Sequence, residues 1–152
     1  MIGRLYSVAI GSQAQTTSKT LVEITSASDS VTLVERLWIK QTSFDTSENL
    51  GTKFEDVTTS GTGTATTPRP LQEGDAAYGG TVETNLTAEP TYSGTILLED
   101  GFNVLSGYLW TPASDDEVIC ISPSQISGMN LDVAPSASMN FSYGCTIREI
   151  GG

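Results

Sequence analysis

The sequence predicts an all-β protein: a single domain, residues 1–152, built as a two-sheet β-sandwich or jelly roll from about eight to ten short strands. Three observations carry this prediction. Short apolar runs rich in Val, Ile, Thr and Tyr recur along the chain, and clusters of Gly, Pro, Ser, Asn and Asp separate them. No stretch keeps a helical period over three turns. A chain of 152 residues is long enough to bury a core as one domain.

The first half of the chain contains four predicted strands. Residues 4–10 and 20–25 are short apolar runs, and residues 31–42 form the longest run. One side of the longest run is apolar apart from Glu35, so we expect this residue near a strand end, an edge or an interface. Residues 52–59 predict a weaker fourth strand.

The second half of the chain contains six further predicted strands. In the last of them, apolar side chains occupy every second position from Met139 to Cys145, which is the period of a strand with one buried face. Asp100-Gly101 is a turn signal inside the second run. The six runs cover residues 81–87, 94–107, 107–112, 117–123, 127–133 and 137–150.

Between the two halves, residues 58–80 are rich in Thr, Gly and Pro and predict a long loop. The residues of 58–67 offer little apolar area to offset their ordering cost. Pro68 and Pro70 fix φ and lack an N–H donor, so they predict a stiff, extended tether around Arg69. Because a loop of this length is usually either functional or disordered, we expect it to contact a neighbouring subunit or partner, or to stay solvated.

The charge of the chain restricts its partners. Seven Lys and Arg against eighteen Asp and Glu give a net charge of −11, which repels phosphate and argues against nucleic acid. No run approaches the roughly 18 apolar residues of a transmembrane helix. The N-terminal MIGRLYSVAIGSQ lacks the apolar run of a signal peptide. We therefore expect synthesis in a cytoplasm and neither nucleic acid nor membrane as a partner.

The residue types that catalysis or metal binding needs are scarce. The chain has no histidine, which removes the commonest general base, the Ser-His triads and imidazole metal sites. Residues 61–63, Gly-Thr-Gly, lack the flanking strand and helix of a phosphate-binding loop and predict a flexible linker. An all-β nucleotide hydrolase would need such loops and a catalytic Asp in a recognisable context. We expect no enzyme activity, no cofactor, no metal and no small-molecule substrate.

Three further features each have two interpretations. The acidic run Asp115–Glu117 can supply oxygen ligands to calcium, but a solvated turn is favoured because no known ligand spacing accompanies it. Cys120 and Cys145 are interpreted as buried free thiols, with a disulfide formed after release from a cell as the alternative. Trp38 and Trp110 favour packed or interface tryptophans over a platform for sugar binding.

Several segments resemble small proteins encoded in tailed-phage genomes. They are MIGRLYSV, TTSGTGTATTPRPLQEGDAA, FNVLSGYLWTP, ISPSQ and APSASMNFSYGCTIREIGG, in this order over most of the chain. The resemblance implies a structural virion protein with a jelly-roll fold, a capsid decoration (cement) protein that binds the major capsid protein lattice as a homotrimer on the capsid surface. Residues 113–119 depart from the family, where a Pro-Glu-containing turn is expected, and residues 43–57 predict a weaker strand than the family has.

The resemblance also implies where contacts lie. Apolar side chains on both parities of the run after residue 100 favour a symmetry interface there. The alternative to a decoration protein is a binding module associated with the tail or fibre that recognises a glycan or a host receptor. The expected capsid or subunit contacts are Arg4, Pro68, Arg69, Pro70 and Leu71, and the expected trimer interface is Phe102, Val104, Tyr108 and Trp110.

Overall fold

The computed structural model describes residues 3–43 and 46–151. Within this part of the chain, twelve strands form two six-stranded sheets, and the helical content is one turn of 3-10 helix at Asp115–Glu117. The predicted all-β sandwich is confirmed, whereas its jelly-roll topology is not. The predicted number of strands is too low, because two short strands lie in the segment expected to be a loop. No helix in the described part is long and apolar enough to cross a membrane.

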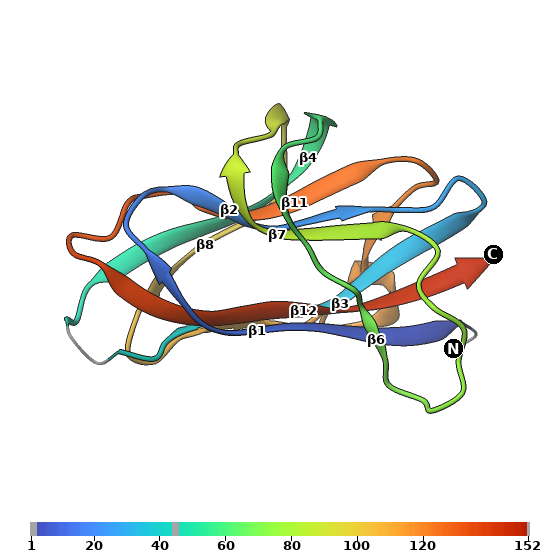
Figure 1. Ribbon diagram of the computed structural model, residues 1–152, viewed down its shortest axis with the longest axis horizontal. Coiled ribbons are helices and arrows are strands. Elements are labelled where there is room, and N and C mark those ends of the chain that lie inside the picture. Colours follow the sequence, from blue (N-terminus) through green and yellow to red (C-terminus); the bar gives the residue numbers. More distant parts are fainter. Residues whose placement is uncertain (1–2, 44–45, 152) are drawn as a thin grey trace.

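The first sheet, which we call sheet A, has the strand order β10-β3-β12-β1-β6, with β9 also paired to β3. Every neighbouring pair is antiparallel, and β12 is the central strand between β1 and β3 (Figure 1). Its strands are β1 (Arg4–Gln15), β3 (Ser30–Gln41), β6 (Arg69–Pro70), β9 (Tyr108–Trp110), β10 (Ile119–Ile121) and β12 (Met139–Gly151).

The second sheet, sheet B, has the order β5-β7-β2-β11-β4-β8 and is also antiparallel throughout. β4, predicted as a weak strand, is eleven residues long, and β8 runs through Asp100-Gly101 without interruption. Its strands are β2 (Lys19–Thr25), β4 (Asn49–Thr59), β5 (Thr62–Ala65), β7 (Thr81–Ala88), β8 (Thr91–Asn103) and β11 (Ile126–Leu131).

The hydrophobic core fills the space between the two sheets. The alternation predicted for the last strand is confirmed: its apolar side chains from Met139 to Ile147 are buried and belong to one core cluster. Sheet B contributes Phe54, Ile24 and Met129 to the same cluster. Burying one face of each sheet in this way is the main favourable contribution to folding.

A β-bulge explains the charged residue inside the longest apolar run. Opposite β12, Glu35 is the extra residue of β3. Because the bulge shifts the alternation by one residue, Val34 before it and Leu37 after it both point into the core. Glu35 forms an ion pair with Arg148 of β12. On the other side of β3, β10 ends its pairing at Val34 and β9 begins at Leu37, so Glu35 lies at a gap in the sheet edge.

A two-stranded ribbon lies over the outer face of sheet B. Residues 57–63 and 86–92, which we call the arch, connect β4 to β5 and β7 to β8, and they project from the sheet in Figure 1. Thr59 pairs with Thr91 and Thr62 with Ala88, so the two connections run side by side. At its feet the ribbon pairs with β11 through β4 and with β2 through β7. The arch therefore straddles β2 and β11.

Beneath the arch, β2 and β11 are buried on both faces. All residues from Thr20 to Ile24 are buried, although a half-covered sheet would alternate. The carboxylate of Glu23 accepts hydrogen bonds from Ser60 Oγ at 2.5 Å and from the Gly61 N–H at 3.0 Å. Near the other end of β2, Glu89 accepts a hydrogen bond from the Thr20 N–H at 2.9 Å. The arch is thus fastened to the sheet by hydrogen bonds to two carboxylates, the buried Glu23 and the exposed Glu89.

The prediction of a long loop over residues 58–80 is wrong for Thr62–Ala65 and Arg69–Pro70, which are strands, whereas residues 71–80 do form a loop. Thr62–Ala65 pairs with β7 as β5, and the Gly63 N–H donates to Glu83 Oε2 at 2.6 Å. A Cβ on Gly61 would lie 2.5 Å from the carbonyl oxygen of Ala88, so this glycine permits a close backbone approach and is no flexible linker. Backbone pairing and carboxylates replace the apolar burial that the composition lacks.

Candidate functional site

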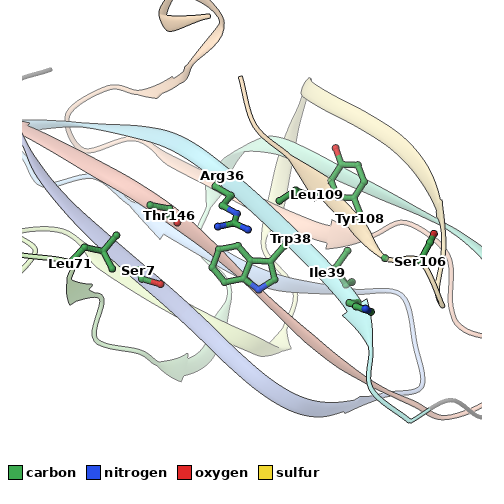
Figure 2. A pocket seen from close by; sticks show the side chains of 11 residues that line it. Ser7, Arg36, Trp38, Ile39, Leu71, Ser106, Tyr108, Leu109 and Thr146 are labelled. Atoms are coloured by element: carbon green, nitrogen blue, oxygen red, sulfur yellow. The ribbon is translucent and has the colours of Figure 1, made fainter. Parts of the chain in front are cut away.

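A groove with a volume of about 540 Å³ crosses the outer face of sheet A. Ser7 of β1, Trp38 of β3 and Thr146 of β12 line its floor, and Figure 2 shows Leu71 and Leu109 on opposite sides of Trp38. Leu71 is 55% exposed and Leu109 is 58% exposed, the largest exposed fractions beside Val133 among the exposed large hydrophobic residues that the structure describes. The groove therefore offers apolar surface that the chain itself does not bury.

Trp38 forms the centre of the groove and is held from two sides. The guanidinium carbon of Arg36 lies 5.5 Å from the centroid of the indole ring, a cation–π contact that Figure 2 shows as two adjacent side chains. Gly144 of β12 lies under the ring edge, since a Cβ on it would be 2.6 Å from Trp38 Cζ2. The indole is therefore packed on the sheet, with part of its surface in the groove.

Cations gather on this face of an otherwise acidic protein. Arg36 and Lys40 flank Trp38 at a spacing of two residues in β3 and line the groove with it. Arg69 of β6 pairs with Ser7 and so shares its face. Arg148 of β12 is the fourth of the seven cations here and is paired with Glu35. Among the described residues, Arg36, Lys40 and Arg69 have no carboxylate within 4.0 Å.

The cations of sheet B are already partnered. Lys53 Nζ lies 2.8 Å from Asp132 and 3.5 Å from Glu99, and the hydrogen bond to Asp132 raises the pKa of Lys53. Lys19 Nζ donates a hydrogen bond to Asn85 Oδ1 at 2.8 Å. Sheet A differs in this respect, because Arg36, Lys40 and Arg69 on its open face form no ion pair with any other described residue.

The five expected capsid contacts divide into two groups. Pro68 is buried, Pro70 is half-buried, and Arg69 and Leu71 are exposed. Arg69 and Leu71 lie on the groove side of sheet A, because Leu71 donates its N–H to the Leu5 carbonyl at 2.8 Å and continues the pairing of β6 with β1. Of the five expected contacts, Arg69 and Leu71 are the exposed ones.

Arg4, the remaining expected contact, belongs to a network inside the chain. Its Nη1 lies 3.6 Å from Oε2 of Glu149, which is buried. Glu149 also accepts hydrogen bonds from the Gly79 N–H at 2.9 Å and from Tyr6 Oη at 3.3 Å. The network holds residues 76–79 against the end of the sandwich, since Tyr6 Oη also donates to the Ala76 carbonyl at 2.9 Å.

Most of the expected trimer interface lies in the core of a single chain. Phe102, Val104 and Tyr108 are buried, and the rings of Phe102 and Tyr108 are 6.0 Å apart. Desolvation raises the pKa of Tyr108 to about 12. Trp110 is half-buried and packs against the core cluster. Side chains already buried in one chain have little surface left for contact with a second chain.

The two cysteines are free thiols in different surroundings. Cys145 is buried, as predicted, and burial raises the pKa of its thiol to about 12. Cys120 is exposed, which contradicts the prediction, because it occupies an outward position of the short edge strand β10. Asp115–Glu117 forms an exposed 3-10 turn. In residues 3–43 and 46–151, no group of three or more Cys, Asp or Glu side chains is placed to hold a metal ion.

Sequence reasoning missed Arg36 and Lys40 as members of a site. The signal was present in residues 36–40. In a strand, alternate side chains point to the same face, so Arg36, Trp38 and Lys40 share one face, and Leu37 and Ile39 share the other. Leu109 carried no such signal, because its place beside Trp38 depends on the pairing of β9 with β3.

Comparison with known proteins finds no matching family model, no similar curated protein and no matching solved structure. The resemblance to phage decoration proteins therefore stays a prediction from the quoted segments. The geometry of the open face is the observation from which function can be argued.

Proposed function

We propose that this chain is a structural protein that decorates a bacteriophage capsid, binding the major capsid protein lattice as a homotrimer and carrying out no catalysis. The observation that supports it most directly is the asymmetry of the sandwich. The chain covers β2 and β11 of sheet B with its own arch, while the outer face of sheet A presents a groove with exposed leucines, a tryptophan and cations. Trp and Arg side chains are enriched at the centres of protein interfaces.

The groove is better suited to binding than to chemistry. Among the described residues that line it, the titratable side chains are Arg36, Lys40 and Tyr108, and Tyr108 has its pKa raised by burial. General acid–base catalysis needs a proton donor and acceptor with pKa values near the working pH, held within reach of one another. A rigid sheet with an open, partly apolar face needs only a complementary surface.

The proposal is tested by sedimenting purified protein with shells that lack it and counting bound copies by quantitative mass spectrometry. We expect saturable binding with a copy number that is a multiple of three and in fixed proportion to the major capsid protein. Sedimentation equilibrium of the free protein checks the trimer independently. Failure to bind shells at any concentration would overturn the decoration proposal.

A tail- or fibre-associated module that recognises a glycan or host receptor is the second candidate. It is favoured by the presence of Trp38 in the groove, because aromatic rings stack on sugars. It ranks second because Arg36 already lies over that ring. Binding to glycans together with no binding to shells would reverse the order.

A further inference from the structure

We propose that the outer face of sheet A docks an acidic segment of a partner protein, one in which Asp or Glu side chains flank a large apolar side chain. We call the contact surface the basic groove: Arg36, Trp38, Lys40, Leu71 and Leu109 line it, and Arg69 lies beside it on the same face. The inference deepens the proposed function, on which it rests for naming the capsid protein as that partner.

The first step is charge. The protein has eighteen acidic residues and seven basic ones, yet Arg36, Lys40 and Arg69 have no carboxylate partner among the described residues. Lys53, on sheet B, contacts two carboxylates. Unpaired cations concentrated on one face attract an acidic surface and orient it during encounter. Carboxylates of a partner protein would supply the ion pairs that these three cations do not form with other described residues.

The second step is the apolar surface between the cations. Leu71 and Leu109 are each more than half exposed and lie on opposite sides of Trp38 (Figure 2). Covering such side chains contributes roughly 25 cal/mol for each Å² removed from water. One large apolar side chain entering the groove of about 540 Å³ would contact all three, while its acidic neighbours reach Arg36 and Lys40.

The third step concerns a second copy of this chain as occupant. In a two-fold contact the same patch meets itself, which would place Arg36 and Lys40 of one copy against those of the other. The basic groove is therefore not complementary to itself. The homotrimer of the proposed function would form through a different surface, and an acidic partner suits the groove better.

The test compares two double variants with the same change in composition. Lys40→Glu with Leu109→Ala alters the basic groove, and Lys19→Glu with Leu97→Ala makes the identical changes on sheet B, where Leu97 is also exposed. As a control, circular dichroism and urea unfolding are used to check that both variants fold. Binding is measured to shells lacking this protein and, as an independent probe, to poly-L-glutamate at low and high salt.

We expect the basic-groove variant to lose at least about tenfold in affinity for both probes and the sheet B variant to stay near wild type. Wild-type binding to poly-L-glutamate should weaken as salt rises. If both variants bind shells as wild type does, the inference is overturned and the proposed function stands. If wild type binds poly-L-glutamate through the basic groove but ignores shells, the proposed function fails and the docking surface stands.

Two further results would overturn the inference. One is wild-type protein that binds neither probe. The other is self-association, seen by sedimentation equilibrium, that is lost only in the basic-groove variant, because the occupant would then be a second copy.

Discussion

Sheet B carries its own cover, the arch, whereas the outward side chains of sheet A stay accessible to solvent. Under the arch, Glu23 and Glu55 are buried and hydrogen-bonded, Glu55 to Asn130 Nδ2 at 2.9 Å. On sheet A, Arg36 and Lys40 are exposed and have no acidic partner among the described residues. The two faces differ in whether their charged side chains have partners: the two carboxylates under the arch have hydrogen-bond donors, and the two cations on sheet A have no acidic partner among the described residues.

This difference shows how one fold can order a polar segment, the arch on sheet B, and leave apolar side chains on sheet A exposed. A Thr- and Gly-rich ribbon orders on sheet B because the carboxylates of Glu23 and Glu83 and strand pairing satisfy its N–H groups. Sheet A lacks such a ribbon, and its exposed leucines are the surface that a second molecule would bury. Both faces can be probed with matched substitutions.

The largest expected effect comes from comparing leucines on the two faces. Leu86→Ala should lower the free energy of unfolding by about 2–5 kcal/mol, because Leu86 is fully buried under Gly61 and Gly63 of the arch. Leu109→Ala should change it by no more than about 0.5 kcal/mol, since that side chain is mostly exposed. Urea unfolding of both variants measures the difference. Equal losses would mean that the arch does not cover Leu86 in solution.

A smaller effect is expected for the carboxylate that fastens the arch. Glu23→Gln replaces one acceptor oxygen with an N–H₂ facing Ser60 or Gly61, which should cost about 1–3 kcal/mol. Amide exchange at Gly61 should accelerate in the same variant. Glu117→Gln, at an exposed position before β10, is the matched control and should have no measurable effect. Unchanged exchange at Gly61 would show that Glu23 is not its acceptor.

The third prediction concerns how accessible the two thiols are to a labelling reagent. Maleimide at neutral pH should label Cys120 in the folded protein and Cys145 only after unfolding, because Cys145 is buried and its pKa is raised to about 12. Mass spectrometry counts the labels. Two labels on the folded protein would contradict the buried position of Cys145.

The same raised pKa has a consequence for stability at high pH. The thiol ionises more readily in the unfolded chain, where its pKa is 9.0, than in the fold, where it is about 12. The unfolded state therefore binds fewer protons in this range, and stability falls as pH rises. Cys145 contributes fully below pH 9 and its contribution is lost between pH 9 and 12. Thermal melts of wild type and Cys145→Ala across that range should converge as pH increases.

Local patterns predicted the fold where one face of a strand meets the core. The alternation from Met139 to Cys145 was sufficient for β12, because burial of every second residue is a local property of a half-covered sheet. Glu35 was recognised as anomalous, and the bulge supplies the reason. Both features depend only on the types of a few consecutive residues, so the sequence was enough to predict them.

The arch and the basic groove could not be predicted in this way. Glu23 and Ser60 are 37 residues apart, and no local pattern around Ser60 predicts that its hydroxyl will donate to a buried carboxylate elsewhere in the chain. Leu71 and Leu109 face the same groove only because β6 and β9 pair to opposite parts of sheet A. Composition alone suggested disorder where long-range hydrogen bonds create order, and an interface where Phe102 and Val104 enter the core.

The position of the last two strands has a consequence for how the chain is made. β11 lies between β2 and β4 in sheet B, and β12 lies between β1 and β3 in sheet A. Neither sheet can close until residues 126–151 have left the ribosome, so four earlier strands wait with unpaired edges. Long-range pairings such as Arg4 with Glu149 also form slowly. Both sheets therefore stay open until β11 and β12 emerge, and a nascent chain stalled before Ile126 would be a substrate for chaperones or for aggregation.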